Sequence, residues 1–251
     1  MCLIALALNV HPRYRLVLAA NRDEFHARPA AAAAFHDDAP DLFGGRDLQG
    51  GGSWLLASRS GRVVAVTNVR TGEPETGTRS RGELVRRCAS GDVLDRELQR
   101  VQAEGADYGR FNLLAFEHKT LWYAGNHPDA RLQPVPDGVH GLSNASLNTP
   151  WPKTDRLRKT MATWSAGEDD IATLFDALSD PRIADDHALP STGIPREWER
   201  RLSAAFITGE DYGTRASTLV LVADDHVRFI ERRFGPQGVA LGHTDQIIER
   251  R

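Results

Sequence analysis

Two long apolar runs with little polar alternation open the chain. They cover residues 2–10 (CLIALALNV) and 15–25 (RLVLAANRDEF), with a short turn sequence between them. A continuous apolar run bounded by turn residues is typical of a strand buried on both faces. Because so few residues connect the two runs, we predict that they pair as an antiparallel hairpin.

The register of this hairpin decides which residues lie beside the first cysteine. In an antiparallel pair, residues equally distant from the turn lie opposite one another. If the turn centres on Pro12 and Arg13, Cys2 lies opposite the neighbourhood of Arg22 and Asp23. We therefore expect the start of the first strand to lie next to the polar end of the second.

Further strands and helices follow from the same patterns. Strands are predicted at residues 53–58, 62–68, 110–117, 120–126, 139–144, 217–223 and 226–233. Helices are predicted at residues 80–90, 91–104, 152–166, 168–180 and 195–206. Ser80 followed by Glu83 matches a capping box at the start of the first helix. Strands that come as hairpins, with helices in separate groups, predict an α+β fold: a four-layer αββα sandwich of antiparallel sheets.

The chain reads as one domain. No linker interrupts its 251 residues, and the alanine-rich stretch 29–40 (PAAAAAFHDDAP) is too short to separate domains. We expect this stretch to be a surface excursion. The glycine-rich segment 44–54 (GGRDLQGGGSW) lacks the lysine of a phosphate loop and opens a strand, so it indicates turn and bulge chemistry. Residues 1–251 are therefore predicted to form a single domain.

Composition excludes several classes of protein. With 26% charged residues and no apolar run long enough to cross a bilayer, a water-soluble protein without a membrane span is expected. The first apolar run is too short for a secretory signal.

Two cysteines cannot form a disulfide framework, which favours a reducing compartment such as the cytoplasm. Lys and Arg (31) do not outnumber Asp and Glu (34), so nucleic acid is not an expected partner. The nine histidines show no metal-ligand spacing.

Cys2 has a chemical use that an internal cysteine lacks. If Met1 is removed, Cys2 carries both a nucleophilic sulfur and a free α-amine, which can act as the base for the thiol. The alternative is a small hydrophobic residue at the start of a strand, as most free cysteines are.

The polar residues expected near Cys2 also allow two interpretations. Arg22 would favour the thiolate and Asp23 would orient the α-amine, or both could belong to a polar strand end with a local salt bridge. Asn68 and Asn144 each follow a strand, where a side-chain amide can donate to an oxyanion or simply complete a turn.

Several motifs together resemble a known family. They are the MC start, the NRDE sequence at 21–24, VAVTNVR around Asn68, and LSNA followed by TPW around Asn144. The combination resembles the NRDE family, also called the Transport and Golgi organisation 2 protein family, from residue 1 to about residue 233. That family in turn resembles N-terminal-nucleophile hydrolases of the choloylglycine hydrolase and penicillin V acylase type. The resemblance implies an N-terminal-nucleophile-hydrolase-like fold.

This resemblance assigns roles residue by residue. It implies that Cys2 is the nucleophile, Arg22 the arginine, Asp23 the nearby acid, and that Asn68 and Asn144 surround the oxyanion. A loose match at YGTRAS makes Arg215 a second arginine of the pocket, and with Arg22 and Asn21 it would bind the ligand. The hydrolases space their arginine and aspartate further apart. Because adjacent strand residues point to opposite faces, Arg22 and Asp23 share a pocket only if the chain bends there; otherwise one of them, or Glu24, has a structural part.

Two functions remain open for one pocket. The family resemblance implies intracellular haem binding and trafficking, with haem as a ligand held by an arginine against a propionate. The alternative is a cysteine amidohydrolase in which Cys2 cleaves the C–N bond of a linear amide and no cofactor is required. The expected partner is a small molecule, either haem or an acyl amide. Whether the protein is an enzyme is left open by the sequence.

Overall fold

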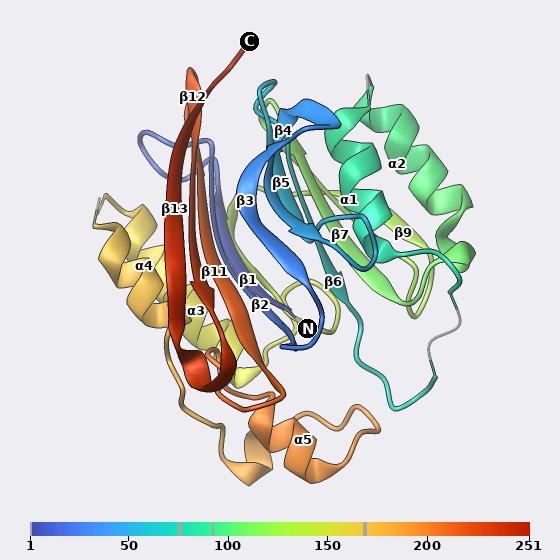
Figure 1. Ribbon diagram of the computed structural model, residues 1–251, viewed down its shortest axis with the longest axis vertical. Coiled ribbons are helices and arrows are strands. Elements are labelled where there is room, and N and C mark those ends of the chain that lie inside the picture. The colour runs from blue at the N-terminus through green and yellow to red at the C-terminus, as the bar shows by residue number, and fades with distance from the viewer. Residues whose placement is uncertain (1, 75–76, 92, 168–169) are drawn as a thin grey trace.

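Two antiparallel β-sheets lie face to face between two pairs of helices (Figure 1). The computed structural model describes residues 2–74, 77–91, 93–167 and 170–251, without the side chain of Cys2. The helices are α1 (Arg81–Ser90), α2 (Leu94–Ala103), α3 (Pro152–Ser165), α4 (Ile171–Leu178) and α5 (Arg196–Arg201). One pair, α1 and α2, covers one sheet and the other pair, α3 and α4, covers the second (Figure 1). The predicted four-layer αββα sandwich is confirmed.

The first sheet has six strands and contains the N-terminal hairpin. Its order is β10 (Gly138–Leu142), β1 (Cys2–Leu8), β2 (Leu16–Phe25), β11 (Tyr212–Val222), β12 (His226–Phe234) and β13 (Ala240–Glu249). The hairpin therefore lies inside the sheet, with hydrogen-bonded neighbours on both sides. This position explains why its sequence is apolar on both faces.

The second sheet has seven strands that follow one another in chain order. They are β3 (Ala30–His36), β4 (Ala39–Asp47), β5 (Leu55–Ser58), β6 (Val63–Asn68), β7 (Phe111–Glu117), β8 (Thr120–Gly125) and β9 (Arg131–Val135). Most of these strands are joined by short connections, so the sheet is a meander of hairpins. Closely spaced strand patterns in the sequence indicate this arrangement.

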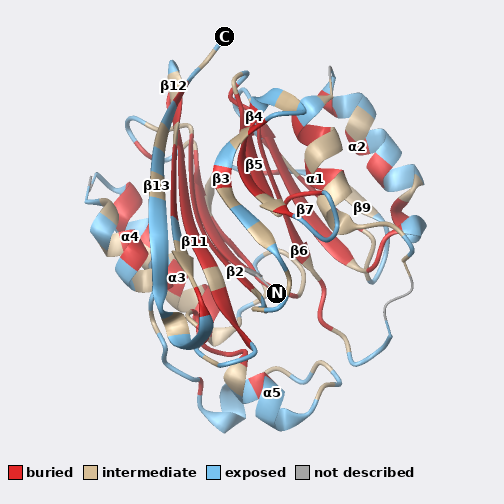
Figure 2. Ribbon diagram, viewed as in Figure 1, coloured by how far each residue is buried: buried red, intermediate tan, exposed pale blue. Residues whose placement is uncertain are grey.

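Alternation along β1 and β2 divides their side chains between two cores. Ile4 and Leu6 face the second sheet and belong to the central core, whereas Leu3 and Ala5 face α3 and α4. A third apolar cluster, which includes Leu84 and Leu113, joins α1 and α2 to the second sheet. Buried residues accordingly run along most strands of both sheets, while β13 at one edge is largely exposed (Figure 2).

The register of the first hairpin agrees with the prediction. Cys2 pairs with Arg22, and Leu8 pairs with Leu16 at the other end of the same ladder. The turn is thus centred near residue 12, and the polar end of β2 lies beside the start of β1.

Several elements differ from the sequence prediction. The alanine-rich stretch forms β3 and the start of β4, because small alanine side chains fit a half-exposed edge strand that pairs with β4. β9 and β13 are also absent from the prediction. The predicted helix at 195–206 is shorter, ending at residue 201. Residues 92 and 168–169, at the starts of two predicted helices, lie outside the described residues.

The capping box at α1 is only half formed. Ser80 caps the helix, but its Oγ accepts from the Gly82 amide at 3.3 Å. The side chain of Glu83 turns to Arg79, whose guanidinium is a stronger partner for a carboxylate than a backbone amide is.

No helix among the described residues is long and apolar enough to cross a membrane.

Candidate functional site

A cleft of about 430 Å³ opens where the polar end of β2 meets the end of β6 and the start of α1. It is lined by Arg22, Asp23, Glu24, Arg28, Asp47, Gln49, Gly50, Ser53, Trp54, Val66, Asn68, Gly77, Thr78, Arg79, Ser80, Arg81, Gly82 and Gly109. Cys2 at the start of β1 pairs with Arg22 on β2, so the cleft lies beside the residue predicted to be the nucleophile. Three of the predicted site residues, Arg22, Asp23 and Asn68, line it directly.

Arg22 is buried at the base of this cleft. Its side chain is 7% exposed, and its guanidinium carbon lies 4.4 Å from the ring centroid of Trp54. Nη2 is 3.8 Å from a carboxylate oxygen of Glu24, whereas Nη1 has no hydrogen-bond partner among the described residues. A buried guanidinium that lines the cleft is suited to attract an anionic group that enters there.

Asp23 is fully buried and lies on the other face of β2. The Thr214 hydroxyl donates to its Oδ1 at 2.7 Å. Burial raises the pKa of Asp23, and the positive charge of Lys153 opposes that rise. Arg215 forms a bulge in β11. It lies between Thr214, which pairs with Asp23, and Ala216, which pairs with Arg22. Arg22 and Asp23 nevertheless both line the cleft beside this bulge, although their side chains lie on opposite faces of β2.

Asn68 and Asn144 are joined to each other. Asn144 is buried, and its Nδ2 donates to the Asn68 backbone carbonyl at 3.1 Å and to Asn68 Oδ1 at 2.9 Å. Because the Asn68 side-chain oxygen accepts this bond, its NH₂ group is oriented away from Asn144. Asn68 lines the cleft and can donate there, whereas Asn144 positions Asn68 from behind.

The structure places Asn21 away from the cleft. Its Nδ2 donates to the carbonyls of Leu178 and Ala205, both at 2.7 Å, and Ser217 donates to its Oδ1 at 2.6 Å. These bonds tie the first sheet to the end of α4 and to the chain that follows α5. Its amide is thus engaged on the helix side of β2, where a ligand in the cleft does not reach it.

Arg215 also has a structural position. Its Nη1 donates to the carbonyls of Phe25, His26 and Arg28 at 2.8, 3.3 and 3.0 Å. The guanidinium therefore holds the connection between β2 and β3. Arg215 lines a smaller inner cavity and is not among the lining residues of the cleft.

The structure describes the side chain of one of the two cysteines. The backbone of Cys2 begins β1, while Met1 and the Cys2 side chain lie outside the described residues. Cys88 lies on the buried face of α1 and is a free thiol. Burial raises the pKa of Cys88 to about 12, so it is protonated and inert at neutral pH.

Sequence reasoning missed three contributors to this site. Trp54, which stacks on Arg22, and Asp47, which pairs with Arg28 at 2.6 Å, both come from the glycine-rich segment interpreted as turn chemistry. Lys153, 2% exposed on α3, contributes its charge toward Asp23. The TPWPK sequence within the family motif was the signal that could have indicated Lys153.

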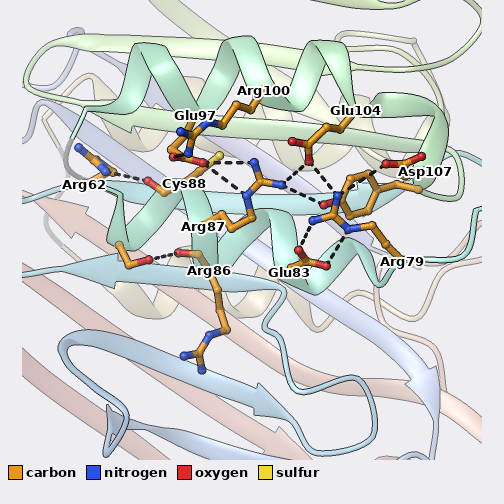
Figure 3. A network of polar contacts seen from close by, with 12 residues as sticks. Arg62, Arg79, Glu83, Arg86, Arg87, Cys88, Glu97, Arg100, Glu104 and Asp107 are labelled. Carbon is orange, nitrogen blue, oxygen red and sulfur yellow. Dashed lines mark hydrogen bonds and ion pairs between the residues drawn. The ribbon is translucent and has the colours of Figure 1, made fainter.

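A network of ion pairs fixes the helical wall of the cleft (Figure 3). Arg79 lines the cleft, but its guanidinium bonds Glu83 and also Glu104, the latter at 2.8 Å. Arg87 contacts the same Glu104 carboxylate at 2.7 Å, which links α1 to the end of α2. The Arg79 guanidinium is thus engaged by carboxylates of the helical wall, whereas Nη1 of Arg22 has no partner among the described residues.

Nothing in the described part of the chain forms a cluster of His, Cys, Asp or Glu that could hold a metal ion.

A small inner cavity of about 50 Å³ lies behind Arg22. It is lined by Arg22, Ala30, Ala31, Trp54, Arg215, Ala216, Glu231, Arg233, Phe234 and Leu241. Glu231 is fully buried and its Oε1 accepts from the Ala33 amide at 2.8 Å. Burial raises the pKa of Glu231 from 4.5 to about 7, against the lowering effects of the Ala33 bond and of Arg233 and Arg22.

Replacing Glu231 with Gln should change how stability depends on pH. The folded protein binds the Glu231 proton more tightly than the unfolded chain does, so this group's contribution to stability is complete below pH 4.5 and is lost as pH rises through about 7. We expect Glu231→Gln, relative to wild type, to gain about 3 kcal/mol in unfolding free energy between pH 4 and pH 8. Urea unfolding across this range measures the difference. A constant difference between the two proteins would contradict the shifted pKa.

Comparison with known proteins identifies the family. A family model described as Transport and Golgi organisation 2 matches residues 1–236. The Transport and Golgi organization protein 2 homolog of Bos taurus is 36% identical over 257 residues, which cover 92% of each chain. The Homo sapiens homolog is 34% identical, again with 92% of each chain covered. The Drosophila melanogaster protein is 28% identical over 92% of this chain and 91% of its own.

A solved structure shows the same fold at low sequence identity. The Caenorhabditis elegans N-acylethanolamine-hydrolyzing acid amidase ortholog matches with a TM-score of 0.55 and 10% identity, covering 88% of this chain and 92% of that one. This likeness confirms the predicted N-terminal-nucleophile-hydrolase-like fold. The full-length family match and the identity to the mammalian homologs together show that the chain belongs to the Transport and Golgi organisation 2 family.

Proposed function

We propose that the protein is an N-terminal cysteine hydrolase that cleaves the C–N bond of a linear amide. The observation that carries the proposal is the pairing of Cys2 with Arg22, whose buried guanidinium lies at the base of the cleft. The similar solved structure is that of an enzyme whose name describes hydrolysis of an N-acyl amide, and we extend that bond class to this chain.

Each residue of the site has a part in this reaction. After removal of Met1, the α-amine of Cys2 takes the thiol proton, and the thiolate attacks the amide carbonyl carbon. Arg22 favours the thiolate by its charge, and the NH₂ group of Asn68 donates to the oxyanion. The proton then passes to the leaving amine, and water hydrolyses the thioester to release the acid and regenerate the thiol.

In this proposal Asp23 holds the α-amine. Its carboxyl is buried, bonded to Thr214 and influenced by the charge of Lys153. Such a carboxylate can orient an ammonium group in a site with little water. Asn144 contributes indirectly, by orienting Asn68.

Intact-mass measurement and an activity assay together test the hydrolase proposal. Protein purified from its native host should lack the mass of Met1, and it should release amine from a panel of N-acyl amide probes. Retention of Met1 in the native protein would overturn the proposal, since the α-amine of Cys2 would then be blocked.

Haem binding and trafficking is a second proposal for the same cleft. The observation that favours it is Arg22 stacked on Trp54, which offers a guanidinium for a propionate beside an aromatic face for the macrocycle. No histidine is among the lining residues of the described cleft, which suits a carrier that releases its ligand better than one with a permanent axial bond. Titration with haem should shift the Soret band, and transfer to an apo-acceptor should follow. An absence of saturable binding at micromolar concentrations would reject this proposal.

A further inference from the structure

Three buried polar atoms without hydrogen-bond partners belong to residues that line the inner cavity behind Arg22. They are Nη1 of Arg22, Nε of Arg233 and Oε2 of Glu231, each without a hydrogen bond to any described residue. All three residues line the same space of about 50 Å³, which is large enough for water. Buried polar groups are almost always satisfied, so an occupant that accepts from the guanidinium groups and contacts the carboxyl is expected there.

Arg22 and Trp54 connect the inner cavity to the cleft. Both residues line the two spaces, and the guanidinium is stacked on the indole between them. The Arg22 guanidinium can therefore interact with two anions. One is a ligand group that enters from the cleft, and the other is the Glu231 carboxylate behind it.

The arginines that line the cavity with Glu231 come from three strands. Arg22 lies on β2, Arg215 on β11 and Arg233 on β12 itself, and all three line the cavity. The residues that β3 and β13 contribute to the lining, two alanines and Leu241, carry no charge. Glu24, 3.8 Å from Arg22, is the acidic group that competes from the cleft side. Glu231 is thus the acidic residue among the described lining of the inner cavity, and the charges of Arg233 and Arg22 act on it.

We propose that Glu231 is a specificity-determining residue that sets how much positive charge Arg22 presents to the cleft. When Glu231 is ionised, it neutralises Arg22 from behind, and the cleft favours an uncharged acyl amide. When Glu231 is protonated, Arg22 is uncompensated, and the cleft accepts an acyl amide that carries a carboxylate. An anionic substrate bound at Arg22 is therefore accompanied by uptake of a proton at Glu231.

The direction of this coupling follows from electrostatics. An anion at Arg22 repels the Glu231 carboxylate and so favours its protonated form. By reciprocity, protonation of Glu231 strengthens anion binding by the same factor. Affinity for an anionic substrate should thus fall as pH rises through about 7, where Glu231 titrates, whereas affinity for a neutral one should not.

Infrared titration of the buried carboxyl tests the coupling without any activity. The band lost in Glu231→Gln should titrate near pH 7 in the wild type. Arg22→Gln should raise its midpoint by about one unit, because one of the two cations that lower the Glu231 pKa is removed. Arg22→Lys keeps the charge and should leave the midpoint nearly unchanged. Arg62→Gln removes an equally buried arginine that pairs with Glu117 instead, and it serves as the matched control. The same midpoint in Arg22→Gln and wild type, or no titrating band, would overturn the proposal.

Binding of two matched probes tests the consequence for specificity. In a Cys2→Ala background, which prevents turnover, affinity for N-acetylglycine should fall about fivefold or more from pH 6 to pH 8. Affinity for neutral N-acetylglycinamide should not change, and Glu231→Gln should bind N-acetylglycine equally at both values. No binding of N-acetylglycine at pH 6, or the same affinity at both pH values in wild-type Glu231, would overturn the inference. The inference rests on the proposed hydrolase, but these measurements need no hydrolysis. A protein that shows the coupling yet cleaves no amide would refute the hydrolase alone.

Discussion

Replacing Cys2 with Ala should abolish hydrolysis of any linear amide that the protein cleaves, with a loss of at least about 10³-fold in kcat. The reason is that Cys2 combines the attacking thiol with its own base in the proposed reaction. Of the hydroxyl groups that line the described cleft, Ser53 Oγ donates to the Gly45 carbonyl and Ser80 caps α1. Amine release from an N-acyl amide, measured under saturating conditions, gives the effect directly.

Cys88→Ala is the matched control for this variant. Cys88 is the second thiol of the chain, buried on α1 and with a pKa raised to about 12. We expect it to alter stability slightly and to leave kcat unchanged. Equal activity in Cys2→Ala and wild type would show that Cys2 is not the nucleophile. Loss of activity in a folded Cys88→Ala variant would show that the wrong thiol was assigned.

Asn68→Ala should lower kcat by about 10²- to 10³-fold while KM changes little. The Asn68 NH₂ group is the amide donor expected to meet the oxyanion, and such a donor acts mainly in the transition state. Steady-state kinetics separates the two parameters. A change confined to KM would instead mean that Asn68 binds the ground-state substrate.

Asn144→Ala provides a graded comparison with Asn68→Ala. Because Asn144 acts by holding Asn68 through Oδ1 and the backbone carbonyl, its removal leaves the donor present but less well oriented. The loss in kcat should be smaller than in Asn68→Ala, and the double variant should resemble Asn68→Ala alone. Additive losses would show that the two asparagines act independently.

Helix α1 shows how far local sequence patterns reach. Ser80 starts the helix as its sequence predicts, since an N-cap depends on bonds within a few residues. The second half of the capping box fails because Arg79 competes for Glu83, and Arg79 is in turn positioned by Glu104 on another helix. A contact between separate elements thus overrides a local pattern.

The edge strands show a different limit. β3 is built largely from alanine and β13 is mostly exposed, so neither has the apolar alternation that marks a strand in sequence. Each forms because a neighbouring strand supplies backbone partners, β4 for the first and β12 for the second. Pairing of this kind is a property of the assembled sheet.

By itself the sequence determined the class of fold, because hydrophobic periodicity sets which strands are buried. It also determined the pairing of Cys2 with Arg22, because a short turn sets the register of the hairpin. Only the tertiary structure decided which polar side chains reach the cleft. Asn21 turns to the helix side, Arg215 binds the β2–β3 connection, and Glu231 lies behind Arg22. These positions depend on a bulge in β11 and on contacts between residues nearly two hundred positions apart, which no local pattern along the chain encodes.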